Sequence, residues 1–254
     1  MSRYCLTLEY DGSGFAGWQD QPGEETVQGA LERALVPLCG HPVTVIGAGR
    51  TDAGVHALGQ RAHFDSNRER EPRVIRRALN ATTPRGLSVL DVVPVLPQFH
   101  ARRSAIWRRY RYRIGNGEVA PALDRERVWH IPRPLVTSTM QEAVGLLLGT
   151  HDFSAFRAAS CQAHHPVRSV IRAEVGRSGD LIEVELVANA FLQHMVRNIV
   201  GTLVRVGSGD WEVSRFAEVF ARGDRRLAGA TAPPWGLYLV EVGYPPMPGG
   251  LASP

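Results

Sequence analysis

A chain of 254 residues with 44% hydrophobic and 21% charged residues has the composition of a folded globular protein rather than a disordered one. All 29 basic residues are arginine, which excludes a lysine Schiff base, a lysine-anchored pyridoxal phosphate and a Walker-type phosphate loop. The net charge of +4 weakly favours polyanionic partners, and no apolar stretch has signal-peptide or membrane-spanning length, so we expect a cytoplasmic protein without membrane contact.

The first hundred residues contain two helical patterns among four strand patterns. Residues 3–10 alternate apolar and polar side chains, which predicts a half-buried strand, and residues 26–38 show helical spacing with Thr26 as the N-cap. The patterns that follow predict strands at 42–47 and 60–65, a helix at 73–80 and a strand at 88–95. The resulting order is β-α-β-β-α-β.

The remaining residues repeat that order with one additional helix. The predicted elements are a strand at 105–114, a helix at 138–148, strands at 167–177 and 181–188, helices at 191–206 and 212–222, and a strand at 236–244. Two ferredoxin-like halves in an α+β fold are the simplest interpretation, with a catalytic cleft between them. Because Pro94 and Pro97 end the last strand of the first half, we divide the chain into residues 1–103 and 104–254.

A glycine-rich loop from Gly47 to His56 is the most informative segment. Its glycines allow a sharp turn and a close approach to a ligand, but their spacing differs from that of a dinucleotide-binding loop. The loop instead carries a carboxylate, Asp52, two residues after a guanidinium, Arg50. An aspartate in such a loop is either a turn former that accepts backbone N–H groups or a reactive group.

The run Gly49-Arg-Thr-Asp-Ala-Gly-Val-His56 resembles the signature of the TruA family of tRNA pseudouridine synthases. The resemblance extends in order along the chain, through Tyr10-Asp-Gly12, Phe15, Gly17-Trp-Gln19, Phe99–Arg102, Arg109–Tyr112, Asp152–Arg157, Ala188–Phe191, His194–Gly201 and Gly236–Leu239. It implies that Asp52 is the nucleophile and that Tyr110 lies against the target base. It also implies a homodimer that modifies positions 38, 39 and 40 in the anticodon stem-loop of tRNA without a cofactor.

The reaction explains why these residue types are needed. Moving uracil from an N1 to a C5 link with ribose changes no oxidation state, and an ionised carboxylate can attack ribose C1′ or uracil C6, or abstract a ribose proton. We predict that Arg197, on a polar strip of an apolar helix, supports Asp52, and that Arg50 helps to displace the target nucleotide. Arg197 has the alternative role of a surface charge at a helix end.

The segment 102–113 combines basic and aromatic residues. Six arginines in this segment suit phosphate contacts, and Tyr110 suits stacking on an extruded base. Tyr110 and Tyr112 share a strand face, so cross-strand aromatic packing is the alternative for either ring. A second interpretation of the basic groups is that they form a solvent-exposed face without a partner. A second interpretation of the whole protein is an RNA-binding module without catalysis.

The cysteines and the remaining motifs favour neither a metal nor another base-modifying activity. Cys5, Cys39 and Cys161 are odd in number and far apart, and the group Cys161, His164 and His165 lacks a distant matching pair, so we predict no metal site. The zinc-deaminase pattern is missing, and Asp11–Gly14 is a poor cofactor loop for a methyltransferase.

Overall fold

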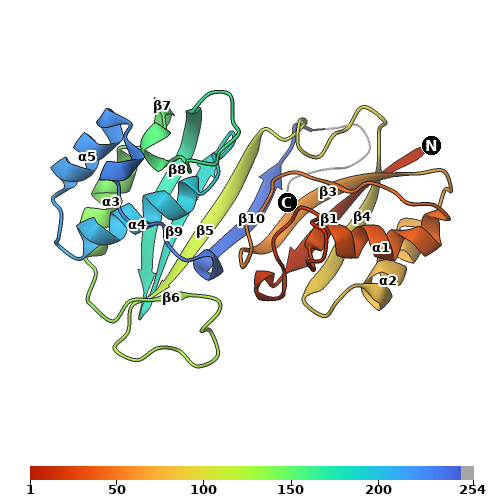
Figure 1. Ribbon diagram of the computed structural model, residues 1–254, viewed down its shortest axis with the longest axis horizontal. Coiled ribbons are helices and arrows are strands. Elements are labelled where there is room, and N and C mark those ends of the chain that lie inside the picture. The colour runs from red at the N-terminus through yellow and green to blue at the C-terminus, as the bar shows by residue number, and fades with distance from the viewer. Residues whose placement is uncertain (247–254) are drawn as a thin grey trace. The chain divides into compact units, whose positions relative to one another are not determined.

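The computed structural model describes residues 1–246 (Figure 1). The described chain forms two compact units: the first contains Met1–Trp107 and residues 239–246, and the second contains Arg108–Tyr238. Among the described residues, no helix combines the length and the apolar character needed to cross a membrane.

The first unit is an antiparallel sheet with two helices. Its elements are β1 (Ser2–Tyr10), α1 (Val27–Cys39), β2 (Ile46–Gly47), β3 (His56–Ser66), α2 (Pro72–Thr82) and β4 (Leu87–Val95). Strand β1 lies between β4 and β3, and β2 pairs with β3. The helices α1 and α2 contact each other (Figure 1), and the buried side chains of β1, which include Tyr4, Leu6, Leu8 and Tyr10, contribute to the core.

Helix α1 has a clear signal at each end. The Thr26 hydroxyl accepts a hydrogen bond from Gly29 N at 3.2 Å, which satisfies one of the amides at the start of the helix. Gly40 ends the helix with a φ of 78°, in the left-handed region that favours glycine. The predicted helix at 26–38 is therefore confirmed, with Thr26 as its cap.

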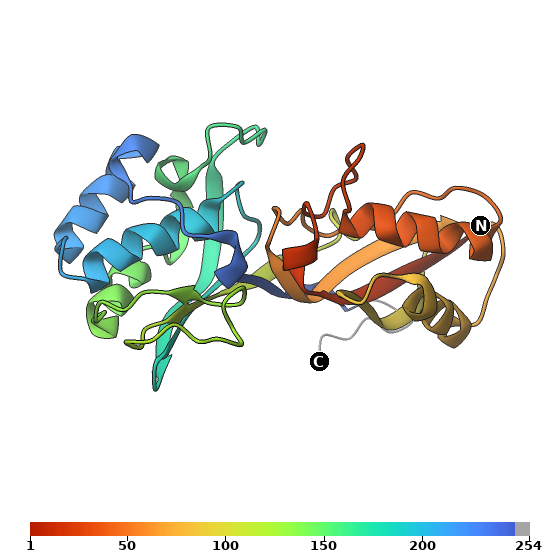
Figure 2. The ribbon, with the colours of Figure 1, turned by 60° about the horizontal axis from the view of Figure 1, so that its bottom comes forward.

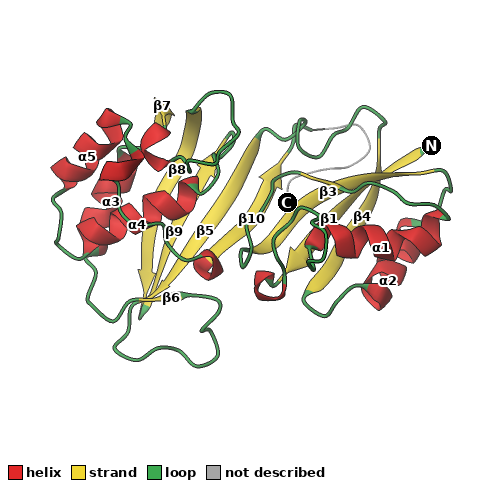
Figure 3. Cartoon of the chain, viewed as in Figure 1, coloured by secondary structure: helices red, strands yellow, loops and turns green. Residues whose placement is uncertain are grey.

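The second unit contains the β-α-β-β-α order of the first, with two short strands and one helix in addition. Its elements are β5 (Trp107–Gly115), β6 (Trp129–His130), α3 (Thr137–Gly145), β7 (Gly149–Asp152), β8 (Val167–Ser178), β9 (Leu181–Ala188), α4 (Met195–Gly207) and α5 (Val213–Arg222). Strands β5, β9, β8 and β7 are neighbours in that order, and β6 runs parallel to β5 (Figure 3). The three helices lie on one face of this sheet (Figure 2). The predicted α+β class is confirmed, and the short strands β6 and β7 interrupt the predicted β-α-β-β-α-β order in the second half.

Several predicted elements begin or end elsewhere in the structure, and three of them show why. Strand β2 covers only Ile46–Gly47 of the predicted 42–47, since Val45 N donates to the Glu32 carboxylate at 2.9 Å instead of to a strand. Helix α4 starts at Met195 rather than 191, because His194 has a φ of 62°. Helix α3 ends at Gly145 rather than 148, and the residues after it form short turns.

The unit boundaries differ from the division at 103/104 in two respects. Residues 104–107 belong to the first unit, as do residues 239–246, where β10 (Leu237–Gly243) runs next to β3. Arg3 ties the segment that leads to residues 104–107 to the first unit. It binds Asp65 through two hydrogen bonds of 2.7 Å and donates to the carbonyls of Pro97 and Phe99 at 2.6 Å. These contacts hold the segment after β4 against β1 and β3.

Candidate active site

The loop that carries Asp52 is fixed to the first unit on both sides of the aspartate. Before it, Ala48 N donates to Arg61 O at 2.7 Å, and Gln60 Nε2 donates to Gly49 O at 2.7 Å. After it, Val55 N donates to Asp52 O at 3.1 Å and closes a turn. The backbone that presents the carboxylate is therefore held independently of any ligand.

A buried polar network lies beside this loop. Gln60 is fully buried, and its amide also donates to Tyr10 Oη at 3.4 Å, while Tyr10 Oη and Thr51 Oγ1 are 2.8 Å apart. Burial raises the pKa of Tyr10 to about 12, so its hydroxyl stays protonated at neutral pH. The network thus links β1, β3 and the residue next to Asp52.

The segment after β1 packs directly on the loop. Trp18 N donates to Thr51 O at 2.9 Å, and Gly12 N donates to His56 Nδ1 at 3.0 Å. Gly17 has a φ of 101°, and a Cβ atom there would lie 2.8 Å from Thr51 O. A side chain at Gly17 would therefore push the loop away. The first-strand motif and the aspartate loop form one structural unit.

Asp52 and Arg50 differ in exposure. Asp52 is half-buried, whereas Arg50 is exposed. A half-buried carboxylate beside a rigid backbone suits attack on a bound group, and an exposed guanidinium suits contact with RNA.

Tyr110 and Arg197 belong to the second unit. Tyr110 is 8% exposed in β5, and its ring meets that of Phe191 edge-on at 5.0 Å. Arg197, in α4, is half-buried, and its Nε donates to Ala232 O at 2.7 Å. Because Ala232 N donates back to Arg197 O at 3.1 Å, the segment after α5 fixes this arginine. That all four predicted site residues meet in one pocket stays a prediction.

Arg197 also lies near Tyr112. Burial raises the pKa of the Tyr112 hydroxyl well above its ordinary value, and the positive charge of Arg197 opposes that shift. Tyr112 is fully buried and donates to Pro233 O at 2.8 Å. Tyr112 therefore has the packing role that the sequence left open for either ring.

The positive charges of arginines on β5 are partly compensated by nearby carboxylates. Arg111 and Arg113 lie opposite Glu185 and Glu183 of β9, and Arg111 is 3.3 Å from Glu185 and 3.6 Å from Glu183. Arg113 lies 3.7 Å from Glu183. Cross-strand carboxylates therefore balance arginines that we assigned to phosphate contacts.

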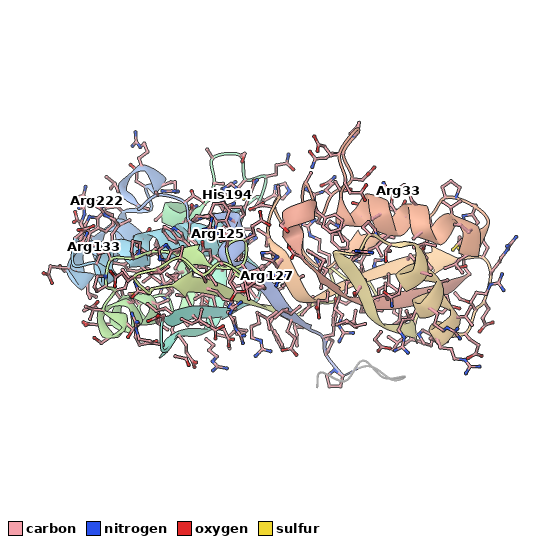
Figure 4. The ribbon with its side chains drawn as sticks, turned by 90° about the horizontal axis from the view of Figure 1, so that it is seen from below. Arg33, Arg125, Arg127, Arg133, His194 and Arg222 are labelled. Atoms are coloured by element: carbon pink, nitrogen blue, oxygen red, sulfur yellow. The ribbon has the colours of Figure 1, made fainter. Side chains whose placement is uncertain are left out.

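Another of the six arginines in residues 102–113, Arg108, does not lie on the β5 face that carries Arg111 and Arg113. Arg108 is 8% exposed and donates to Asn189 O at 2.8 Å, so it has a structural role. Figure 4 shows Arg125 and Arg222 apart from each other in the second unit.

Sequence reasoning missed the group that holds the loop. Gln60 is a polar residue in a strand and lies opposite Leu8 of β1, and this unusual burial of an amide was the available signal. Within residues 1–246, no cluster of three histidine, cysteine or acidic side chains is placed to hold a metal ion.

A family model described as tRNA pseudouridine synthase matches residues 7–102 and 143–245. The chain belongs to the tRNA pseudouridine synthase family. It is therefore an RNA-modifying isomerase, as its signature predicted. Asp52 and Arg197 lie within the matched ranges of the synthase model, whereas Tyr110 lies in the stretch between them.

Individual synthases are similar over almost the whole chain, including that stretch. A tRNA pseudouridine synthase A from Rhodospirillum rubrum is 49% identical over 100% of this chain and 91% of its own length. One from Xanthobacter autotrophicus is 49% identical over 96% of this chain and all of its own length, and one from Coxiella burnetii is 47% identical over 97% and 94%.

Proposed function

We propose that this synthase converts uridine to pseudouridine at positions 38, 39 and 40 in the anticodon stem-loop of tRNA, with Asp52 as the nucleophile and without a cofactor. The relatives' name, tRNA pseudouridine synthase A, supports tRNA as the substrate. The choice of positions rests on the resemblance of the motifs around Asp52.

The reaction balances without an added reactant. The C1′–N1 bond breaks, uracil turns, and a C1′–C5 bond forms. The proton on C5 leaves to solvent, and N1 gains one. The nucleotide as a whole is neither oxidised nor reduced, so the protein needs to supply only a nucleophile, a shaped pocket and proton transfer.

The observation that carries this proposal is the rigid presentation of Asp52. Its neighbours Gly49 and Thr51 are held through Gln60, Tyr10 and Trp18, so the half-buried carboxylate is already positioned before RNA binds. A turn-forming aspartate would not need such support from two strands.

The other three residues have supporting roles in this proposal. Tyr110 stacks on the extruded uracil, Arg197 stabilises the ionised form of Asp52, and the exposed Arg50 contacts RNA where the target nucleotide leaves the stack. Arg197→Met should lower kcat and move the acid limb of the pH–rate profile to higher pH. Full activity with an unmoved limb would refute the role of Arg197.

We further propose that the synthase acts as a homodimer whose two copies share one tRNA. Sedimentation should give twice the chain mass of 27.9 kDa. A monomer with full activity would contradict this part of the proposal.

The substrate positions can be tested with tRNA transcripts that carry tritium at uridine C5. One set has a single uridine at position 38, 39 or 40, and the control has cytidine at all three. Wild-type protein should release tritium from each member of the set and none above background from the control. Equal release from the control would show a different target, and binding without any release would leave only an RNA-binding protein.

A further inference from the structure

A loop in the second unit forms an aromatic pocket at the far end of β5. Residues 116–128 connect β5 to β6 and extend from the sheet (Figure 1). The pocket has a volume of about 270 Å³, and its walls include Pro121, Arg125, Trp129 and Trp235. The proposed reaction uses none of these residues.

Tyr112 packs against both segments that carry the indoles of the pocket. The Trp129 ring meets the Tyr112 ring at 6.2 Å with an interplanar angle of 84°. A Cβ atom on Gly236 would lie 2.6 Å from the Tyr112 ring, so the turn that carries Trp235 also rests on this tyrosine. Trp235 is nevertheless 39% exposed, so part of the residue is accessible to a ligand.

The base of the loop is closed by hydrogen bonds. Asn116 Nδ2 donates to the carbonyls of Ile131 and Arg133 at 2.8 Å, and His130 Nε2 lies 2.9 Å from Gly117 O. The pocket is therefore built on fixed elements and does not depend on a ligand for its shape.

The pocket lies beside β5, the strand that carries Tyr110, because Trp129 belongs to β6 and β6 pairs with β5. Trp129 is paired with Ile114, four residues after Tyr110 in β5. At about 3.3 Å per residue, this separation is about 13 Å along the strand. It is on the order of four stacked base steps of one nucleic acid strand. One RNA loop can therefore reach both places.

We propose that the Trp129–Trp235 pocket binds a second unpaired base of the tRNA, a few nucleotides from the target uridine. This inference rests on the proposed function. Stacking on indole suits any base because each base has a π-face, and the Arg125 guanidinium adds a planar cation. The cavity is below the usual range for a drug-sized ligand, which suits one base rather than two.

The charges of the loop support stacking over phosphate binding. Arg125 and Arg127 are accompanied by Glu118, Asp124 and Glu126, so the loop has no excess of positive charge. A phosphate-binding surface would need such an excess. Loss of the pocket should therefore weaken RNA binding without changing its dependence on salt.

A double-mutant cycle between protein and RNA tests the proposal. The protein is wild type or Trp235→Ala, and each tRNA transcript has one abasic nucleotide in the anticodon loop away from the target. Tritium release gives kcat and KM for each pair. Trp235→Ala should raise KM about tenfold, and one abasic position should do the same in wild type but add nothing in the variant.

Two further variants control for folding. Trp211→Ala removes an indole that lies between Arg205 and Arg215, just after the C-terminal end of α4. This variant should leave KM and the abasic pattern unchanged. Trp235→Phe keeps an aromatic face and should retain most of the coupling.

Two outcomes would overturn the proposal: additive changes in KM at every abasic position, or equal effects of Trp235→Ala and Trp211→Ala on KM. The sedimentation mass of Trp235→Ala is measured as well, and additive changes in KM together with a changed mass would identify a protein interface. No release by wild type from any transcript would contradict the proposed function instead. The same cycle is then measured on Kd for each transcript, which tests the pocket independently.

Discussion

At the scale of single residues, the groups around Asp52 separate into those that react and those that hold. Thr51, Tyr10 and Gln60 form a buried network with no direct access to a substrate, yet they fix the backbone on which the carboxylate stands. A rigid support of this kind matters because small displacements of a reacting group reduce catalysis strongly.

Tyr10→Phe tests this support. The variant loses the Tyr10–Thr51 hydrogen bond, so it should lower the free energy of unfolding by about 1 kcal/mol and also lower kcat. Tyr4→Phe is the matched control, because Tyr4 is equally buried in β1 and its hydroxyl binds the backbone of Arg70 at 3.0 Å, away from the loop. Urea unfolding and tritium release should show similar stability losses but an activity loss only for Tyr10→Phe. Equal activities would contradict the positioning role.

The sequence was informative at this scale wherever a local motif carried the signal. The glycine spacing around Asp52 indicated a sharp loop, and the structure has Gly54 with a φ of 77° there. The role of Gln60 was not predictable, because it depends on the register that places β3 beside β1 and on the path of the loop above it. Side-chain partners that come from distant segments leave no periodic trace in the sequence.

At the scale of elements, the segment 229–232 lies on α4 and holds Arg197. A Cβ atom on Gly201 would overlap the carbonyl of Ala230, whereas one on Gly145, at the end of α3, would meet no atom within 4 Å. Because Gly201 is closely packed and Gly145 faces open space, replacement by alanine should have opposite effects on stability at these two positions.

Gly201→Ala should destabilise the protein and lower activity, because the segment that binds Arg197 must move. Gly145→Ala should be neutral or stabilise by up to about 1 kcal/mol, since alanine favours a helix more than glycine does. Thermal unfolding and tritium release of both variants check this. A stable, fully active Gly201→Ala would show that the segment does not position Arg197.

The contact between β3 and the segment after β4 should depend on pH. His63 Nδ1 accepts a hydrogen bond from Ala101 N at 3.1 Å. Burial, followed by the positive charges of Arg3 and His100, lowers the pKa of His63 to about 4. The unfolded chain takes up this proton near pH 6.5, before the folded protein does, so stability is lost as pH falls from about 6.5 to 4.

We expect the protonation of His63 to lower the free energy of unfolding by about 2 kcal/mol as the pH falls from about 6.5 to 4. In His63→Asn an amide oxygen can still accept from Ala101 N, and the loss of stability between pH 6.5 and 4 should be smaller. His164→Asn, an exposed histidine, should behave like wild type. Urea unfolding at several pH values measures the slopes, and equal slopes for His63→Asn and wild type would exclude His63 as the cause.

Element order was predictable, whereas some element ends were not. The strand at 42–47 shortened because Glu32 of α1 takes the amide of Val45, and the helix after Ala190 started late because His194 adopts a left-handed backbone. The first cause is a tertiary contact, and the second is a backbone angle that a periodic pattern does not reveal. The short strands β6 and β7 were also missed, because two to four residues are too few for a periodic pattern.

At the scale of the whole molecule, the net charge of +4 does not translate directly into an RNA-binding face. The arginines of β5 that face Glu183 and Glu185 are already compensated. RNA contacts should therefore come from exposed arginines outside this ladder, such as Arg103.

The salt dependence of tRNA binding distinguishes the two groups. Each phosphate contact contributes about 0.7 to 0.9 to the slope of log K against log salt concentration. Arg103→Gln should reduce the slope by about that amount, and Arg111→Gln should change it much less. The opposite ranking would mean that the β5 ladder opens to bind phosphate.

The central claim is that Asp52 performs the chemistry. The most direct test compares tritium release from C5-labelled tRNA by wild type, Asp52→Ala and Asp91→Ala, with tRNA binding measured in parallel. Asp91 is an exposed carboxylate on β4 and serves as the control. Wild type and Asp91→Ala should release tritium at similar rates, and Asp52→Ala should bind tRNA but release none. Release by Asp52→Ala at the wild-type rate would contradict the account.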